Sequence, residues 1–453
     1  MPKITKKPKL TEEQIQEELD AAFDKANKKD QISSPRGTQD ILPHDHKYWE
    51  YITESARLIL RGWYFQEIQT PIFEEKKLYE RGVGQETDIV QKEMFELKSR
   101  SRGTHYVLRP EATAGIARAY LEHGMRSWPR PVKLFTVGPF FRYERPQAGR
   151  FRQHHQLSLE VLGSAAPVTD VEVMYVLHLL FKRLGLEDYV VQVNSLGLPA
   201  ERKEYIKLLK DHYRRNIRKL SREDKERLKR NPLRVLDSKD EKAIRVANTA
   251  PRLIDHLSET SKKHFEYVTN MLGELEVPFE VNPRLVRGLD YYTHTVFEFV
   301  SRTAGEQGVS FTSGGRYDGL VRQLGGRDTA AVGAGIGIER VVDRIKKEGI
   351  DLTLTDQPLL YVAQLGDRAK VVALKLMRKL NEAGIPFAEG VDRDGMQPQL
   401  KAADRLGVGW AAIIGQKEVL DGTIILRNME SGMQEVVDQA NLVEELQKRL
   451  HLE

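Results

Sequence analysis

The chain has 453 residues, of which 40% are hydrophobic and 30% charged, with a formal net charge of +5 and no cysteine. This length exceeds what one ordinary core requires, so we expect two or three domains. The absence of cysteine excludes disulfide bonds and thiolate zinc sites and is typical of a reducing compartment. No apolar run approaches the ~20 residues that span a bilayer, and the N-terminus lacks the apolar segment of a signal peptide. We therefore expect a cytoplasmic protein without a membrane partner.

We assign residues 1–33 to an N-terminal extension. Within this extension, 11–29 have the period of an amphipathic helix, which Ser33-Ser34-Pro35 would end. From residue 34 to residue 196, helical and strand patterns are mixed. Residues 34–196 form the first part of an expected α+β domain. Helical periods occur at 49–63 and 168–186, and strand patterns occur at 133–144, 153–163 and 189–197.

Residues 197–266 differ from their surroundings because they are helical in pattern, basic and poor in glycine. The part from 201 to 245 holds 17 lysines and arginines against nine acidic residues. Such a segment can contact phosphate backbones, although on charge alone a solvated helical face is the better explanation. We interpret 197–266 as a helical insertion, because strand patterns return within 267–346, the expected second part of the first domain.

A polar linker at 347–357 precedes a last domain at 358–453. This domain alternates strand and helix patterns, which predicts a small α/β domain with mostly parallel strands. The strand patterns lie at 358–365, 386–391, 409–415 and 422–428, with helices between them and at the C-terminus.

The strand pattern at 153–163 places polar side chains on one face. Because side chains alternate along a strand, Gln156, Ser158 and Glu160 face one way and the leucines between them face the other. A buried carboxylate without partners is costly. The polar row is therefore expected to meet water, a pocket or a ligand.

Arginines gather in the segment that leads into this strand. Arg142 lies on the preceding strand, and the connecting turn adds Arg145, Arg150 and Arg152. A planar guanidinium suits bidentate contact with phosphate oxygens. The alternative is an exposed hairpin with surface ion pairs, each worth at most ~1 kcal/mol. His154 and the next residue, also a histidine, should face apart and so cannot easily share a metal ion.

Two further clusters combine polar groups with the start of a regular element. In VLRPEAT, at 107–113, Arg109 and Glu111 follow an apolar strand, and the pattern predicts a helix whose first turn holds Pro110. In LVRGLDYYTHTVFEFV, at 285–300, Arg287 and Asp290 precede a strand. We expect the two tyrosines that follow to point to opposite faces of that strand.

Glycines dominate the last two clusters, GGRYDGL at 314–320 and AAVGAGIGIERVV at 330–342, where Arg340 lies one turn into a predicted helix. Glycine permits close approach of the backbone to a ligand. The G-x-G-x-G spacing differs from the dinucleotide fingerprint, and the chain has no P-loop. If ATP binds here, it binds by neither of these common routes.

Together these clusters resemble the histidyl-tRNA synthetases, a family of class II aminoacyl-tRNA synthetases, from about residue 34 to the end. Segment 141–160 resembles class II motif 2, AAVGAGIGIER resembles motif 3, and EIQTPIFE at 67–74 resembles motif 1. RGTQDILP at 36–43, VLRPEAT, NPLRVLDSK at 231–239 and LVRGLDYYTHTVFEF are more specific to the histidine enzymes. The resemblance implies an antiparallel sheet flanked by helices, a helical insertion and a C-terminal α/β anticodon-binding domain.

The resemblance further implies ATP-dependent activation of L-histidine to histidyl-adenylate and transfer to the 3′-terminal adenosine of tRNA-His. Arg142, at the α-phosphate, and Arg287, a fixed cation beside it, would be the catalytic residues. The residues expected to bind histidine are Glu111, Ala112, Thr113, Arg142, Gln156, Glu160, Arg287, Tyr291, Tyr292 and Tyr317. Those expected to bind ATP are Arg142, Glu144, Arg150, His154 and Arg340.

Other partners follow from the same resemblance. Mg²⁺ is expected on the pyrophosphate end of ATP, with no metal site of the protein's own. Arg145 and Gln147 would meet the acceptor end of the tRNA, the basic insertion would clamp its acceptor arm, and the last domain would read the anticodon. That domain could instead serve only to stabilise a dimer. A homodimer is expected through motif 1.

The sequence departs from the family at His154, where a phenylalanine usually stacks on adenine; an imidazole can stack, but it is smaller and could titrate near neutrality. Two other functions stay open. A catalytically inactive paralogue that senses histidine or binds tRNA would typically have lost RGLDYY or the last domain, and both are present. A class II synthetase for another amino acid would have to explain the intact histidine-specific blocks.

Overall fold

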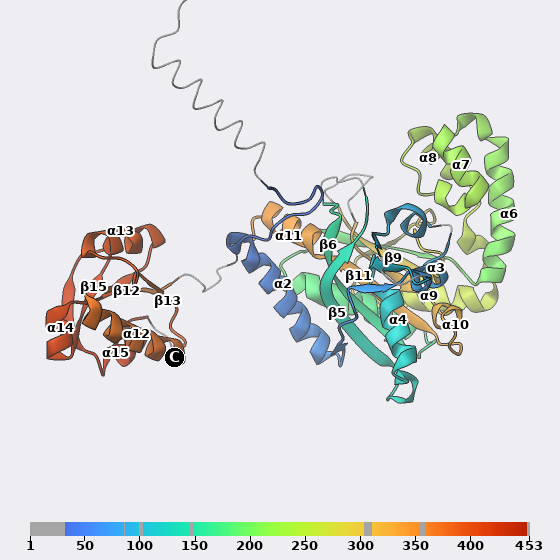
Figure 1. Ribbon diagram of the computed structural model, residues 1–453. Coiled ribbons are helices and arrows are strands. Elements are labelled where there is room, and N and C mark those ends of the chain that lie inside the picture. The colour runs from blue at the N-terminus through green and yellow to red at the C-terminus, as the bar shows by residue number, and fades with distance from the viewer. Residues whose placement is uncertain are drawn as a thin grey trace, which may run out of the picture. The chain divides into compact units, whose positions relative to one another are not determined.

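The computed structural model describes residues 32–85, 87–98, 103–144, 149–302, 310–350, 352 and 358–450 (Figure 1). The chain divides into two compact units, Met1–Asp351 and Leu352–Glu453. The helix expected at 11–29 and most of the linker expected at 347–357 lie outside the described residues. Within the described part of the chain, none of the helices is both long and apolar enough to cross a membrane.

An eight-stranded sheet forms the centre of the first unit. Its strands lie in the order β1 (Gln66–Glu67), β5 (Val132–Phe141), β6 (Gln153–Leu162), β11 (Ala331–Gly337), β10 (Ser310–Arg316), β9 (Thr293–Ser301), β7 (Tyr189–Ser195) and β8 (Phe279–Val281). The six inner strands pair antiparallel, and only the edge strands β1 and β8 pair parallel. This confirms the expected antiparallel α+β sheet. We had expected Arg142 to lie on strand β5. This strand ends at Phe141, however, so Arg142 follows it.

Three helices cover one face of this sheet. They are α2 (Pro43–Gly62), α5 (Val168–Arg183) and α11 (Ile338–Lys347). Helix α2 packs against α5 and α11, and these two contact β6. The leucines that alternate with the polar row of β6 face this layer and are buried. The polar row therefore faces the opposite side of the sheet.

Smaller elements border that opposite side. A three-stranded sheet is formed by β2 (Phe73–Glu75), β4 (Tyr106–Leu108) and β3 (Glu96–Leu97). The accompanying helices are α3 (Lys76–Gly82), η1 (Ile89–Glu93), α4 (Thr113–Glu122), η2 (Met125–Ser127) and α10 (Leu320–Gln323). Helices α3, α4 and α10 pack together beside the sheet.

The segment between β7 and β8 is helical, as its pattern predicts. It contains α6 (Pro199–Arg215), η3 (Ile217–Lys219), α7 (Arg222–Arg230), η4 (Pro232–Val235), α8 (Glu241–Ala247), η5 (Leu253–His256) and α9 (Glu259–Glu274). Figure 1 shows α6, α7 and α8 grouped at one end of the first unit. Ser221, Asp240 and Ser258 cap α7, α8 and α9 by accepting backbone N–H groups. Helix α9 packs against α5, β7 and β9, so it joins the segment to the sheet.

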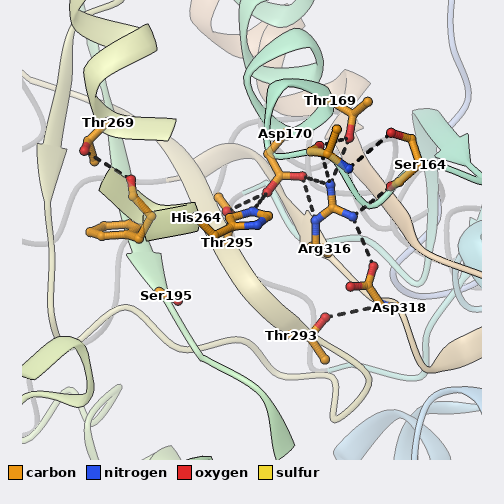
Figure 2. A network of polar contacts seen from close by, with 12 residues as sticks. Ser164, Thr169, Asp170, Ser195, His264, Thr269, Thr293, Thr295, Arg316 and Asp318 are labelled. Atoms are coloured by element: carbon orange, nitrogen blue, oxygen red, sulfur yellow. Dashed lines mark hydrogen bonds and ion pairs between the residues drawn. The ribbon is translucent and has the colours of Figure 1, made fainter. Parts of the chain in front are cut away.

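A buried ion pair ties these layers together (Figure 2). Asp170 of α5 and Arg316 of β10 are both fully buried, and their shortest N···O distance is 2.5 Å. The other oxygen of Asp170 accepts from Thr295 of β9 at 2.7 Å and contacts His264 of α9 at 2.7 Å. Arg316 also donates to the carbonyl of Ser164 at 2.9 Å. Four elements from distant parts of the chain thus meet at one charge pair.

The second unit is a five-stranded sheet in the order β13 (Phe387–Glu389), β12 (Leu360–Gln364), β14 (Trp410–Ile414), β15 (Thr423–Asn428) and β16 (Gln434–Asp438). Its helices are α12 (Asp367–Glu382), α13 (Met396–Leu406), α14 (Gln416–Asp421) and α15 (Leu442–Leu450).

The expectation of mostly parallel strands in this unit is wrong. Strand β12 pairs parallel with β13 and β14, but the β14–β15 and β15–β16 pairs are antiparallel. Strand β16 is largely exposed, so it lacks the apolar signal that marks a strand. It joins β15 through a short hairpin, a connection available only to antiparallel strands.

The ion pair yields a prediction about stability. The Asp170→Ala substitution would leave the buried Arg316 guanidinium with only its longer ion pair, to Asp318 at 3.2 Å, which should lower the free energy of unfolding by ~3–5 kcal/mol. Urea denaturation would measure this loss. The control is Arg252→Ala, which breaks the exposed Arg252–Asp255 pair and should cost at most ~1 kcal/mol. Equal losses in the two variants would contradict the prediction.

Candidate active site

The open face of the large sheet carries the polar row of β6 beside the glycines of β11. Gln156, Ser158 and Glu160 pair in register with Gly337, Gly335 and Gly333. A Cβ atom at Gly333 would lie 1.6 Å from a carboxylate oxygen of Glu160. Glycine is therefore required at this position, because any side chain would occupy the space of the Glu160 carboxyl group.

Glu160 lies at the centre of a group of contacting, largely buried side chains, to which we refer as the pocket residues. Thr113 donates from its hydroxyl to one oxygen of Glu160 at 2.7 Å, and the Tyr317 hydroxyl donates to the other. The rings of Tyr291 and Tyr317 lie 5.5 Å apart, and those of Tyr291 and Tyr292 lie 4.7 Å apart. The structure thus brings five of the predicted histidine-binding residues into one group.

Our expectation that Tyr291 and Tyr292 point to opposite faces of a strand is wrong. Strand β9 begins only at Thr293, so the two tyrosines lie in the preceding turn, where the alternation of a strand does not apply. Both side chains are buried beside each other.

Glu111 lies at the N-terminus of α4 and accepts hydrogen bonds from the backbone N–H groups of Thr113 at 2.8 Å and Ala114 at 2.9 Å. The helix begins at Thr113 with Ala112 as its N-cap, so Pro110 precedes it instead of occupying its first turn. Burial raises the pKa of the Glu111 carboxyl, and the two backbone hydrogen bonds oppose this rise. The carboxyl group is held in place before any ligand binds.

Burial also raises the pKa of Glu160, to about 8, against the opposing hydrogen bonds from Tyr317 and Thr113. The nearby Glu111 carboxyl adds to the increase. Glu160 is therefore mostly protonated at neutral pH in the free protein. Two buried carboxyl groups side by side favour a ligand that carries an ammonium group or N–H donors.

A cluster of arginines lies around one carboxylate, that of Glu144. Arg150 approaches a Glu144 oxygen at 3.2 Å and Arg142 approaches the other at 3.9 Å. Arg142 also donates to the carbonyl of Pro110 at 2.9 Å, which places it beside the Glu111 segment. Burial lowers the pKa of Arg340, and the Arg150 guanidinium lowers it further. The three arginines outnumber the carboxyl groups of Glu144 and of Glu93, which also interacts with Arg142 and Arg150, so the cluster is suited to bind phosphate groups.

The two adjacent histidines lie on opposite faces of β6, as predicted. His155 contacts Glu339 of α11 at 3.0 Å and lies edge-on to Trp49 of α2, with the ring centroids 4.7 Å apart. His154 pairs in register with Phe140 on the open face. Among the described residues, no group of three or more His, Cys, Asp or Glu side chains could hold a metal ion.

The expectation that His154 could titrate near neutrality is wrong. Burial lowers the pKa of His154 to about 3, and the charge of Arg142 lowers it further. The imidazole is therefore a neutral ring at physiological pH. A neutral ring can stack on a base without adding a charge to the cluster.

Arg287 lies on the same face, at the other side of the pocket. Its guanidinium forms an ion pair with Glu298 and donates to the Ser313 hydroxyl at 2.6 Å. It also lies 5.8 Å from the centre of the Tyr292 ring. The buried Nε atom has no hydrogen-bond partner among the described residues, which leaves a donor for a ligand.

Glu298 and Ser313, the partners of Arg287, were not among the site residues predicted from the sequence. The two residues are register partners on β9 and β10. The alternation of side chains along 293–301 would have predicted which face of the strand carries Glu298. It would not have predicted that Glu298 lies close to Arg287. The predicted acceptor-end residues Arg145 and Gln147 lie outside the described residues.

Family models and known proteins match most of the chain. A family model described as "Histidyl-tRNA synthetase" matches residues 37–341, and one described as "Anticodon binding domain" matches 360–449. A "Histidine--tRNA ligase" of Halothermothrix orenii is 42% identical, covering 92% of this chain and 99% of that protein. A "Histidine--tRNA ligase" of Thermosynechococcus vestitus is 43% identical, covering 91% of this chain and 96% of that protein. The crystal structure of apo S. aureus histidyl-tRNA synthetase is 34% identical, with a TM-score of 0.76, covering 92% of this chain and 99% of that chain.

The raised pKa of Glu160 gives a prediction about stability and pH. As pH increases from about 5 to about 8, the unfolded chain ionises at this position while the folded protein keeps the proton, so folding loses stability. Glu160→Gln cannot titrate. Its free energy of unfolding relative to the parent should therefore rise over this range, by at most ~1.4 kcal/mol per pH unit.

Urea denaturation of the ligand-free proteins at several pH values would measure this difference. Glu266→Gln, at an exposed position of α9, serves as the control and should follow the parent at every pH. A constant difference between Glu160→Gln and the parent would show that Glu160 titrates normally.

Proposed function

The chain belongs to the histidyl-tRNA synthetase family, and we propose how its residues perform the reaction of that family. It is a histidine–tRNA ligase, which activates histidine with ATP and transfers the histidyl group to tRNA-His. One observation carries our assignment of the site. The buried pocket of Glu111, Thr113, Glu160 and three tyrosines lies on the same sheet face as the arginine cluster.

We assign the pocket to the amino acid. The ammonium group of histidine would lie among Glu111, Thr113 and Gln156, and Glu160 and Tyr292 would contact the two imidazole nitrogens. Tyr291, Tyr317 and Ala112 would form the walls. Buried polar groups left without partners would penalise an analogue that lacks either nitrogen, by ~10⁴-fold if the pocket resembles other sites that read polar groups.

We assign the arginine cluster to ATP. Arg142 would hold the α-phosphate, with Arg150 and Arg340 on the β- and γ-phosphates, and the neutral ring of His154 would stack on adenine. Glu144 keeps Arg142 and Arg150 together, as their contacts with its carboxylate support.

Activation requires that a carboxylate oxygen of histidine attack the α-phosphorus. A new O–P bond forms, and the bond to the bridging oxygen breaks, so the electron pair leaves with pyrophosphate. Two anions must approach each other, and fixed cations favour this approach. Arg287 is placed for this role, because Glu298 and Ser313 hold its guanidinium on the pocket face.

We further propose Mg²⁺ as the companion of ATP. Mg²⁺ at such sites is bound by one or two carboxylates plus the substrate phosphates, which suits a chain whose described residues form no acidic cage. Glu144, between the arginines, is the carboxylate that would contact it. Bound there, the ion would neutralise charge on the leaving pyrophosphate.

The remaining partner assignments are proposals from the family. Arg145 and Gln147 would meet the acceptor end of tRNA-His, the basic helices at 197–266 would clamp the acceptor arm, and the domain at 358–453 would read the anticodon. The excess of cations at 201–245 supports the clamp. We place the protein in the cytoplasm.

Histidine activation can be tested by ATP–pyrophosphate exchange, measured with each of the twenty amino acids and without tRNA. We expect exchange with histidine alone, because the pocket has polar partners for both imidazole nitrogens. Exchange with another amino acid would overturn the pocket assignment. Histidine binding in calorimetry without exchange would favour a regulatory paralogue.

We propose a homodimer that forms through the segment around motif 1. Large apolar side chains are exposed there: Ile72 is 47% and Phe73 53% exposed, and Tyr64 is 70% exposed. Exposed apolar side chains, such as the neighbouring Ile72 and Phe73, mark protein interfaces where they form a patch.

Analytical ultracentrifugation would test this proposal. The parent should sediment as a dimer, and Phe73→Asp should shift it toward monomer because a charge would be buried at the contact. Leu208→Asp, at an exposed position of α6, is the matched control and should remain dimeric. A monomeric parent would refute the proposal.

A further inference from the structure

The block NPLRVLDSK, at 231–239, belongs to the helical segment between β7 and β8, yet it contacts the loop that carries Arg287. Arg234 of η4 extends its guanidinium to two different elements. One nitrogen donates to the carbonyl of Gly288 at 3.3 Å, and another forms an ion pair with Asp88, at the start of η1. Burial favours the neutral form of Asp88, but the contacts with Arg234 outweigh it and lower the pKa of that carboxyl.

Two further contacts join the helical segment to the same loop. Asn231 donates from its side chain to Asp290 at 3.5 Å, and Arg202 of α6 donates to the carbonyl of Tyr292 at 2.8 Å. The loop at 285–292 connects β8 to β9 and is not part of either strand. The helical segment therefore contacts this loop at three residues, through the backbone carbonyls of Gly288 and Tyr292 and through the side chain of Asp290.

The block also interacts with Arg287 itself. Burial raises the pKa of the Asp237 carboxyl, and the Arg287 guanidinium is the strongest of the charges that oppose this rise. Val235 and Leu236 belong to the same hydrophobic cluster as Tyr291 and Tyr292. Packing and charge thus reinforce the hydrogen bonds between the helical segment and the pocket.

We propose that Arg234 is a positioning residue for Arg287. It bridges Asp88 and Gly288, the residue directly after Arg287, and so fixes the backbone from which Arg287 reaches the α-phosphate. The helical segment then serves the activation step, which does not need tRNA, in addition to the acceptor arm. This inference rests on the proposed role of Arg287. A displacement of about 1 Å at a reacting centre can cost ~10²-fold in rate, so a bridge of this kind has a measurable effect.

The Arg234→Ala variant tests the proposal in ATP–pyrophosphate exchange with histidine and no tRNA. We expect kcat to decrease by ~10-fold or more, with the KM for histidine changed less than about 3-fold, because Arg287 acts mainly in the transition state. Arg234→Lys should recover only part of the loss, since an ammonium group cannot hold both partners as the planar guanidinium does.

The control variant is Arg252→Ala. Arg252 is an exposed arginine of the same helical segment, and its ion pair is with Asp255 instead of with the loop. This variant should exchange like the parent. The Arg234 side chain is 25% and Asp88 53% exposed, so losing their pair should cost at most ~1 kcal/mol of stability. If Arg234→Ala nevertheless unfolds, Asp88→Asn takes its place and should lower kcat in the same direction.

A double-mutant cycle with Arg287→Ala distinguishes the positioning role of Arg234 from the proposed role of Arg287 itself. If Arg234 acts through Arg287, the double variant should exchange no more slowly than Arg287→Ala alone. Additive losses, or an Arg234→Ala variant with normal exchange and reduced charging of tRNA, would overturn the positioning role. Full exchange by Arg287→Ala would instead refute the proposed role of Arg287, and with it this inference, while leaving histidine activation intact.

Discussion

The ion pair between Asp170 and Arg316 joins the helix layer of the first unit to the strand end that leads into Tyr317. Arg316 ends β10, and the next residue is Tyr317, whose hydroxyl donates to Glu160. Asp170 belongs to α5 and also accepts a hydrogen bond from the Thr295 hydroxyl of β9. One buried charge pair therefore fixes the strand end from which the pocket is built. Breaking such a pair leaves a buried charge uncompensated, so the surrounding elements have a single favourable arrangement.

The open sheet face separates two kinds of chemistry. At one end, Glu160 and Glu111 are buried carboxyl groups whose pKa values burial raises. Toward the other end of β6, Arg142 and Arg150 both contact the carboxylate of Glu144. A ligand with an amine or imidazole at one end and phosphates at the other matches this distribution of charge. Glycine at 333 makes the arrangement possible, because a side chain there would displace the Glu160 carboxyl group.

The helical segment between β7 and β8 is more closely connected to the site than its basic surface indicates. Its outer helices carry the cations that would attract tRNA, but Arg202, Asn231 and Arg234 point back to the loop of Arg287. A segment that touches both a nucleic acid and a catalytic loop has the contacts needed to link one to the other. Such a link requires a continuous physical connection, which the shared hydrophobic cluster supplies.

The sequence by itself determined the polar row of β6, the antiparallel α+β sheet, the helical segment and the family, because these depend on local periodicity and on motifs. Tertiary structure decided which groups meet. Tyr291 and Tyr292 share one pocket because β9 begins after them, and His154 stays neutral because the folded chain buries it beside arginines. The register of β9 with β10 places Glu298 beside Ser313, and the loop before β9 brings Arg287 into contact with both side chains. Register and burial arise from contacts between residues far apart in the chain, and no local pattern encodes them.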